Sequence, residues 1–188
     1  MNNCLFLDRD GTIIEYGDGY NFKPEKIRLI RGADKLISAF NRAGYKVIFI
    51  TNQGGIGKGL YTEDDVFKIH AKINDLLAES GGHADDLFYC PHDPNGIGKY
   101  RAVCSCRKPG GLLLQKAIEK YNADIKNSLF LGDNITDKQC AESVGVRFYP
   151  LSFRHVITTS HGFRSEIRAY TDETIERILS FALHVQQV

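Results

Sequence analysis

The sequence has 188 residues, an ordinary length for one domain with a real apolar core, and we expect a single domain over residues 1–188. Its 24 Lys and Arg residues nearly balance its 23 Asp and Glu residues, which argues against a nucleic-acid-binding surface or a polybasic membrane patch. The apolar runs are too short to span a bilayer and the first residues show no signal-peptide pattern, so we expect a cytoplasmic monomer without nucleic-acid or membrane partners.

Predicted strands and helices alternate along the chain. The strands are expected at residues 5–8, 46–51, 86–89, 128–132 and 146–149. The helices are expected at residues 33–43, 62–79, 111–121, 137–144 and 171–183. This alternation is typical of an α/β fold with a doubly wound, mostly parallel sheet. Two stretches, 90–109 and 152–169, do not follow the pattern.

Two carboxylates follow the first predicted strand. Asp8 and Asp10 are one residue apart, and Gly11 lets the chain turn away. Ligands of an open α/β sheet gather at this edge, and two adjacent acids repel each other, which favours a bound cation or a shared proton. The pattern suits a carboxylate nucleophile beside a general acid/base with a metal between them. A simple turn is the alternative, because Asp and Gly are ordinary turn residues.

The second predicted strand ends in a polar, glycine-rich segment. Thr51, Asn52 and Gln53 are followed there by Gly54 and Gly55. A hydroxyl group and main-chain amides in such a turn can hold phosphate oxygens. The alternative is an ordinary strand-to-helix turn capped by Thr and Asn.

Residues 90–109 carry soft metal ligands in two close pairs. Three cysteines and one histidine form the set: Cys90, His92, Cys104 and Cys106. Four such ligands favour a structural, tetrahedral zinc site, whereas a catalytic zinc keeps one position open. A disulfide or a redox pair is the alternative. A zinc ion would order a loop that has no apolar face to bury.

A basic pair comes directly after the last cysteine of this loop. Lys108 can place a positive charge on a transferring phosphoryl group. Arg107 can hold a second anionic or hydroxylated part of a substrate. Pro109 suits the first turn of the next predicted helix. The common alternative is a solvated basic pair.

The fourth predicted strand ends just before Asp133. A carboxylate at this position can complete an oxygen shell for Mg²⁺ together with Asp8 and the main-chain carbonyl of Asp10. Capping is the structural alternative for this segment, since Asn134 can cap the next helix.

Thr136 and Asp137, which follow Asn134, can also have purely structural roles at the start of the helix. Thr136 is a second candidate for the cap of the helix expected from residue 137. Asp137 can be simply a favourable charge in the first turn of that helix.

Taken together, these motifs resemble the haloacid dehalogenase superfamily of phosphohydrolases. The matching pieces are Asp8-x-Asp10-Gly11-Thr12, Thr51, Lys108 and Gly132-Asp133 with Asp137 nearby. The nearest likeness is to its small, cap-poor group of D-glycero-D-manno-heptose 1,7-bisphosphate phosphatases and histidinol phosphate phosphatases, which share Thr-Asn-Gln and the zinc ligands followed by Cys-Arg-Lys-Pro. The glycine-rich run at 54–62 and the pair Gly19-Tyr20 look more like the heptose enzymes.

The resemblance implies a Rossmann-like fold with a minimal cap and a set of residue roles. Asp8 would be the nucleophile and Asp10 the general acid/base, with Thr51 and Lys108 stabilising the transferring group. Mg²⁺ would be held by Asp8, Asp10 and Asp133, and Zn²⁺ by the loop. Substrate would be bound by Gly19, Tyr20, Asn52, Gln53, Arg107 and Asn134. Asn134 is a departure, because the heptose enzymes usually carry Lys there.

The implied activity is Mg²⁺-dependent removal of the C7 phosphate from D-glycero-D-manno-heptose 1,7-bisphosphate through an aspartyl-phosphate. The substrate would be a small phosphorylated sugar on the route to nucleotide-heptose precursors of lipopolysaccharide or surface polysaccharide. A histidinol-phosphate phosphatase is the alternative in the same superfamily. A nucleic-acid 3′-phosphatase is disfavoured by the near-neutral charge, and an inactive zinc-bearing binding module is the alternative from another class.

Overall fold

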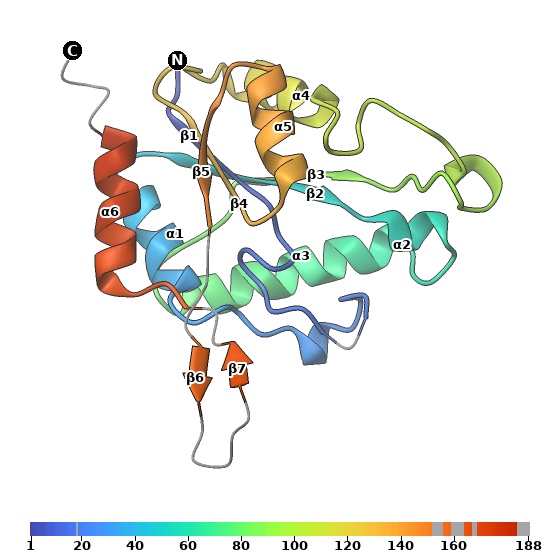
Figure 1. The fold of residues 1–188 in the computed structure, drawn as a ribbon, viewed down its shortest axis with the longest axis horizontal. Coiled ribbons are helices and arrows are strands. Elements are labelled where there is room, and N and C mark those ends of the chain that lie inside the picture. The colour runs from blue at the N-terminus through green and yellow to red at the C-terminus, as the bar shows by residue number, and fades with distance from the viewer. Residues whose placement is uncertain (18, 152–155, 159–163, 167–168, 184–188) are drawn as a thin grey trace.

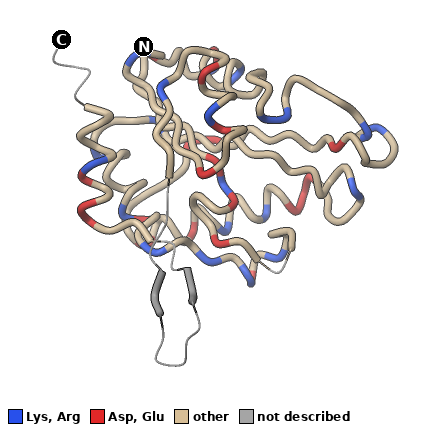
Figure 2. Tube along the Cα trace, viewed as in Figure 1, with Lys and Arg blue, Asp and Glu red and all other residues tan. Residues whose placement is uncertain are grey.

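The computed structural model describes residues 1–17, 19–151, 156–158, 164–166 and 169–183, the short pieces 156–158 and 164–166 by their backbone alone (Figure 1). Charged side chains of both signs are interspersed along the described trace, in keeping with the near-zero net charge (Figure 2). In the described part of the chain, the helices are too short or too polar to cross a membrane.

A five-stranded parallel sheet forms the centre of the molecule, with the strand order β3-β2-β1-β4-β5. The strands are β1 (Cys4–Leu7), β2 (Lys46–Asn52), β3 (Asp86–Cys90), β4 (Leu129–Gly132) and β5 (Arg147–Pro150). All five were predicted to within one residue at each end. The doubly wound α/β prediction is therefore confirmed.

Helices cover both faces of the sheet (Figure 1). On one face lie α1 (Ala33–Arg42), α3 (Glu63–Ala78) and α6 (Asp172–Leu183), and on the other lie α4 (Leu112–Tyr121) and α5 (Ile135–Ser143). Successive strand residues point to opposite faces. Leu5 and Leu7 therefore enter the core under α1, α3 and α6, while Phe6 enters the core under α4 and α5.

The chain order explains where a ligand should bind. From β1 the chain continues to β2 and β3 on one side, and α4 then carries it across to β4 and β5 on the other. Strand β1 thus marks the point at which the strand order reverses. In open α/β sheets, the crevice beyond the carboxyl ends of the strands at such a point is the usual ligand site.

Helix starts follow local capping, and one of them corrects a prediction. Helix α3 begins after Thr62, whose hydroxyl accepts from the main-chain N–H of Asp65 in the expected capping box. Helix α5 begins at Ile135, two residues before the expected start, because Asn134 is its N-cap. The first turn of α4 lies beyond Pro109, contrary to the prediction, since Gly111 is the N-cap of that helix.

Five short elements were not predicted. Residues Gly54–Gly57, expected as a turn, form one helical turn, α2. Two 3-10 helices are η1 (Pro24–Lys26) and η2 (Gly98–Tyr100). Within the stretch 152–169, β6 (Val156–Thr158) and β7 (Arg164–Glu166) pair antiparallel. Among the described residues between β1 and α1, η1 is the sole helix, in keeping with the expected minimal cap.

Candidate active site

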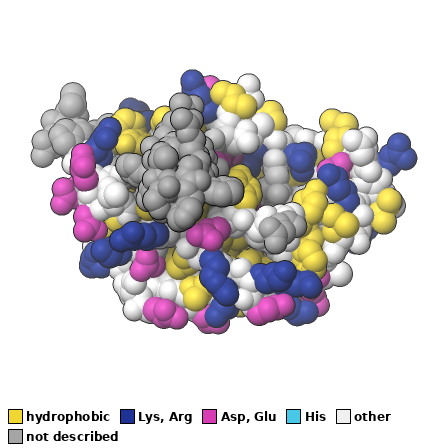
Figure 3. All heavy atoms as spheres, turned by 60° about the horizontal axis from the view of Figure 1, so that its bottom comes forward, with side chains coloured by type: hydrophobic (Ala, Val, Ile, Leu, Met, Phe, Trp, Pro, Cys, Tyr) yellow, Lys and Arg dark blue, Asp and Glu magenta, His cyan; other side chains and the backbone are white. Residues whose placement is uncertain are grey.

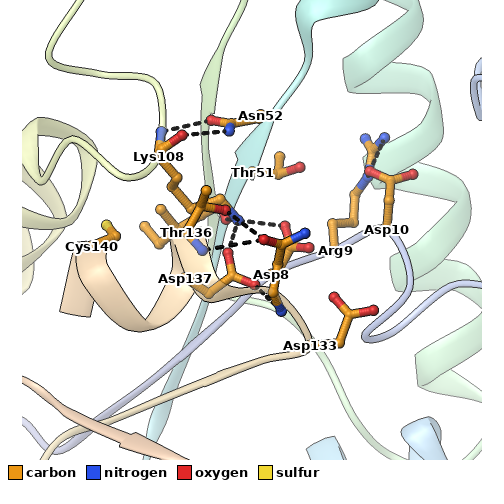
Figure 4. A network of polar contacts seen from close by, with 12 residues as sticks. Asp8, Arg9, Asp10, Thr51, Asn52, Lys108, Asp133, Thr136, Asp137 and Cys140 are labelled. Atoms are coloured by element: carbon orange, nitrogen blue, oxygen red, sulfur yellow. Dashed lines mark hydrogen bonds and ion pairs between the residues drawn. The ribbon is translucent and has the colours of Figure 1, made fainter. Parts of the chain in front are cut away.

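A buried lysine connects two carboxylates at the end of β1 (Figure 4). Lys108 Nζ lies 2.6 Å from Asp8 Oδ1 and 2.7 Å from Asp137 Oδ1, and it donates to the main-chain carbonyl of Ile50 at 2.8 Å. Its side chain is only 3% exposed. Asp8 extends β1, Asp137 comes from the first turn of α5, and Lys108 comes from the loop before α4. The fold therefore brings three separate segments to one point.

The charges of this group depend on one another. Burial raises the pKa of Asp8 to about 6, against the attraction of the Lys108 ammonium, which lowers it. Burial alone would lower the pKa of Lys108, but the carboxylates of Asp8 and Asp137 outweigh it and the net shift is upward. At neutral pH the lysine is therefore positively charged, and Asp8 is mostly an ionised carboxylate available for attack on an electrophile.

Three carboxylates form a possible cation site. Oxygen atoms of Asp8, Asp133 and Asp137 lie within 4.8 Å of one another. Hard oxygen donors of this kind fit Mg²⁺, which is usually held by one or two carboxylates together with water and substrate phosphate. Asp133 was expected in such a site. Asp137 was noted near Gly132-Asp133 in the family motif, with a first-turn charge as the structural alternative, but it was not predicted as a metal ligand. Its side chain is 1% exposed and belongs to this cluster.

Local sequence explains the position of Asp137. Its Oδ2 accepts from the main-chain N–H of Asn134 at 3.1 Å, while the side chain of Asn134 accepts from Thr136 N. This capping box leaves Asp137 Oδ1 free to face Lys108. Gly132 permits the close approach, because a Cβ built there would lie 2.4 Å from Asp137 Oδ2. The Asn-x-x-Asp spacing is the sequence signal for this capping box, but it carries no signal for the contact with Lys108.

Asp10 is held in a different network, beside the first one (Figure 4). Its Oδ2 accepts from Gln53 Nε2 at 2.9 Å and pairs with Arg9 Nη2 at 2.9 Å. Its Oδ1 accepts from Asn21 at 2.9 Å. Gln53 in turn accepts from the buried hydroxyl of Tyr61 at 2.8 Å. The partners of both oxygens therefore fix the orientation of the Asp10 carboxylate.

The sequence did not indicate several members of this network. Arg9 is 1% exposed, although an arginine between two aspartates would be expected on the surface. Asn21 and Tyr61 belong to segments for which no such contact was predicted. Their partners come from distant parts of the chain, so local spacing carries no signal for them.

Thr51 and Asn52 lie at the end of β2, but in different roles. Thr51 is 1% exposed and its hydroxyl accepts from Gln53 Nε2 at 2.9 Å. Asn52 donates to the main-chain carbonyl of Lys108 at 3.1 Å and accepts from its N–H at 2.9 Å. Both polar atoms of Asn52 thus hold the segment that carries Lys108, and the expected substrate contact of Asn52 stays a prediction.

A cleft of about 210 Å³ opens beside Asp10. Eight residues line it: Asp10, Tyr16, Gly19, Tyr20, Asn21, Asn52, Gln53 and Tyr61. Five of these were predicted as site residues. Three other hollows among the described residues are larger, but none of their lining residues belongs to the site. We therefore take the smaller cleft as the entrance for a ligand.

Two expected substrate residues lie outside that lining. Asn134 is exposed at the start of α5, where its side chain accepts from Thr136 N. Arg107 donates from Nη1 to the carbonyl of His92 at 3.2 Å. Both lie next to segments that form the site.

The soft ligands of residues 90–106 come together in one cluster. One ligand atom each of Cys90, His92, Cys104 and Cys106 lies within 4.8 Å of all the others. The sulfur atoms are 3.1–3.5 Å apart, too far for a disulfide, and the cysteines are free. A Cys₃His donor set fits a structural zinc ion.

The same loop has a second attachment to the body of the protein. Tyr100, from η2, donates to Glu63 Oε1 at the start of α3, and Tyr89 of β3 donates to Glu63 Oε2. Arg107 and Lys108 follow directly after the last cysteine. The loop is thus held on both sides next to the segment that carries Lys108.

The chain is similar to known proteins over most of its length. The family model described as polynucleotide kinase 3 phosphatase matches residues 3–150. A D-glycero-alpha-D-manno-heptose-1,7-bisphosphate 7-phosphatase of Burkholderia mallei is 38% identical over 146 residues, covering 77% of each chain.

Two solved structures share the whole fold. A HAD-like phosphatase of Mesorhizobium loti superposes with a TM-score of 0.82 at 28% identity, over 98% of this chain and 87% of the other. The D,D-heptose 1,7-bisphosphate phosphatase of B. bronchiseptica, complexed with magnesium and phosphate, gives a TM-score of 0.75 at 26% identity, over 95% and 99% of the two chains.

Proposed function

The chain belongs to the polynucleotide kinase 3 phosphatase family of haloacid dehalogenase-like phosphatases, and from this premise we propose that it removes the C7 phosphate of D-glycero-D-manno-heptose 1,7-bisphosphate. Such an enzyme serves the synthesis of nucleotide-heptose precursors of lipopolysaccharide or surface polysaccharide. The observation that carries the proposal is the buried Asp8–Lys108–Asp137 group beside Asp10 and the cleft. We further propose that residues 1–188 act as one cytoplasmic, monomeric phosphatase domain.

In the proposed mechanism, an oxygen of Asp8 attacks phosphorus and the bond from phosphorus to the sugar oxygen breaks. Asp10 gives its proton to the departing oxygen. Asp10 then takes a proton from water, whose oxygen attacks phosphorus and releases Asp8 and inorganic phosphate. Lys108 keeps its charge and stabilises the phosphoryl oxygens. Thr51, next to Gln53, orients the transferring group.

The carboxylates of Asp8 and Asp133 would hold Mg²⁺ with the main-chain carbonyl of Asp10, and Asp137 would bind either the ion or its water. When bound, the ion neutralises charge on the transferring phosphoryl group. Zn²⁺ would be held by the Cys₃His cluster and would fix the segment with Arg107 and Lys108. In this proposal Asp8 is the nucleophile, and Asp10 gives and takes the protons that are transferred.

A substrate panel tests the proposal. Heptose 1,7-bisphosphate, histidinol phosphate and a 3′-phosphorylated oligonucleotide are compared at matched concentrations, with inorganic phosphate release as the measurement. We expect the highest kcat/KM for the bisphosphate. Preference for histidinol phosphate or the oligonucleotide would overturn the substrate, and turnover near zero on every phosphomonoester with zinc still bound would favour an inactive binding module.

The mechanism has a separate test. Asp8→Asn replaces the nucleophilic carboxylate by a neutral amide and should lower kcat by roughly 10³-fold or more. Asp8→Asn keeps the size of the side chain, so thermal unfolding checks that the fold is intact. Phosphatase activity retained by a folded Asp8→Asn protein would contradict the nucleophile assignment.

A further inference from the structure

The two oxygens of the Asp10 carboxylate differ in the number of donors that they face. Oδ2 accepts from Arg9 Nε at 3.0 Å and from Gln53 Nε2 at 2.9 Å, and it also pairs with Arg9 Nη2 at 2.9 Å. Among the described residues, Asn21 Nδ2 is the one side-chain donor to Oδ1, at 2.9 Å. A carboxylate oxygen has about two lone-pair directions, so the donors on Oδ2 leave no room for a proton there. The proton of a neutral Asp10 therefore belongs on Oδ1.

The surroundings of these donors separate the two oxygens further. Arg9 and Gln53, the partners of Oδ2, are both buried, whereas Asn21 is half-buried. Figure 4 shows the guanidinium group of Arg9 against the Asp10 carboxylate, where its positive charge stabilises negative charge on Oδ2. Asp10 and Asn21 both line the cleft, and Arg9 does not. We therefore take Oδ1 as the oxygen that a ligand in the cleft can reach.

Main-chain contacts hold the side chain of Asn21 in place. Its Nδ2 also donates to the carbonyl of Glu15 at 2.9 Å, and the N–H of Glu15 donates in turn to the carbonyl of Arg28 at 3.0 Å. A main-chain carbonyl can only accept, so this contact determines which end of the Asn21 amide faces Asp10. Gly17 permits the arrangement, because a Cβ built there would lie 2.8 Å from Asn21 Oδ1. The donor on Asp10 Oδ1 is therefore fixed in direction.

Asp10 is the single carboxylic acid among the eight residues that line the cleft. Tyr16 and Tyr20 also line it, and both are exposed. Figure 3 shows hydrophobic side chains, a class that includes tyrosine, beside Lys and Arg on the right-hand part of the molecule. Aromatic rings in such a wall contact the apolar parts of a ligand and carry no acidic proton at neutral pH. Protonation of a departing alkoxide therefore falls to Asp10.

We propose that Oδ1 of Asp10 is the oxygen that gives and takes the transferred proton, and that Asn21 is the positioning residue that directs it at the leaving oxygen. This assignment rests on the proposed function. In the first step the bond from phosphorus to Asp8 forms and the bond to the sugar oxygen breaks. The Oδ1 proton passes to that sugar oxygen, and its electron pair stays on Oδ1. In the second step Oδ1 takes one proton from the attacking water. Between the two steps, the N–H of Asn21 stabilises the Asp10 carboxylate by a hydrogen bond to a charged acceptor.

Two substrates with different leaving groups test the assignment. Heptose 1,7-bisphosphate releases a sugar alkoxide that must be protonated, whereas p-nitrophenyl phosphate releases a stable phenolate that needs no acid. The measured quantity is kcat/KM, because it covers the steps up to departure of the leaving group and excludes the later hydrolysis of the aspartyl-phosphate. Asn21→Leu removes the donor to Oδ1. We expect its kcat/KM to fall by about 10-fold or more on the bisphosphate and to stay within about twofold on p-nitrophenyl phosphate.

Two further variants complete the experiment. Asn21→Gln keeps an amide donor, and its ratio of the two kcat/KM values should lie closer to that of the wild type than the ratio of Asn21→Leu does. Asn127→Leu is the matched control, since Asn127 Nδ2 donates to Asp124 Oδ2 at the same distance of 2.9 Å in the turn before β4, at the strand end opposite to the site. It should leave the ratio unchanged. Thermal unfolding of each variant checks the fold.

The possible failures are distinguishable. An equal loss of kcat/KM on both substrates, or no loss on the bisphosphate, would overturn the role of Asn21 while the proposed function stands. A wild type that prefers another alkyl phosphomonoester to the bisphosphate would overturn the proposed substrate alone, because the comparison with p-nitrophenyl phosphate is then made with that ester and still tests Asn21.

Discussion

At the scale of single residues, the buried carboxyl of Asp8 links ionisation, stability and metal binding. Burial raises its pKa to about 6, above the value of about 4 for an exposed Asp. The folded state therefore holds this proton more tightly than the unfolded state. The stabilising contribution is fully present below about pH 4 and is lost as the pH rises through about 6.

This linkage predicts a pH-dependent difference between the wild type and Asp8→Asn, both free of metal. Above about pH 6 the wild type carries a buried charge that Asn lacks, so its stability relative to Asp8→Asn should be lower at about pH 7.5 than at about pH 5. The measurement is the difference between the two Tm values as a function of pH. A constant difference across this range would contradict the shifted pKa.

Gln53 is the residue through which Asp10 is oriented. It donates to Asp10 and Thr51, and it accepts from Tyr61. Replacing Gln53 by Leu should lower kcat by about 10-fold or more with little change in KM, because the direction of Asp10 matters most in proton transfer. Tyr61→Phe removes only the outer hydrogen bond and should produce a smaller fall in kcat. Wild-type kcat in Gln53→Leu would show that Asp10 needs no such support.

At the scale of elements, the start of α5 combines a capping motif with the site. Asn134 caps the helix, and the same box directs Asp137 toward Lys108. Loss of the cap therefore acts on both stability and the carboxylate cluster.

Asn134→Ala should lower the free energy of unfolding by about 1 kcal/mol, the usual cost of losing an N-cap side chain. Asn134→Asp keeps an oxygen acceptor and serves as the control, with stability close to that of the wild type. Urea unfolding gives both values. Equal stability of Asn134→Ala and the wild type would mean that the main-chain hydrogen bond from Asn134 to Asp137 is sufficient by itself.

At the scale of the whole molecule, the cysteine cluster connects the sheet to the segment that carries Lys108. Cys90 ends β3 and pairs in register with Asn52 of β2, while Cys106 comes two residues before Lys108. The loop between them contains a single 3-10 helix, η2, and few buried apolar side chains among its described residues. A metal ion at this point would order the loop and position Lys108.

Metal content and its removal test this role. We expect about one zinc ion per chain by elemental analysis, from the single Cys₃His set. Chelation should lower Tm and reduce kcat/KM by about 10-fold or more, and added Zn²⁺ should restore both. Purified protein without zinc, with Tm and kcat/KM unaffected by a chelator, would contradict a structural zinc.

Particular residues show which features of the fold and the site could be predicted from sequence patterns and which could not. Apolar runs placed all five parallel strands, and the strand ends then predicted that Asp8, Thr51 and Asp133 meet at one edge. The close pairs of cysteine and histidine predicted the cluster. The central position of Asp137 was not predicted. One of its oxygens accepts a hydrogen bond in the local capping box, and the other faces Lys108 from the loop before α4. The spacing of residues along the chain indicates only the capping box.

The sequence by itself determined the strand–helix alternation, the acid pair at the end of β1, the soft-ligand set and the family, because each is a local pattern of residue types. Only the tertiary structure decided that Lys108 lies buried between two carboxylates and that Arg9, Asn21 and Gln53 hold Asp10. The physical reason is that burial and charge pairing depend on which distant segments the sheet brings together. The acid pair led to the proposed chemistry, and segments distant in the sequence bury Asp8 and orient Asp10.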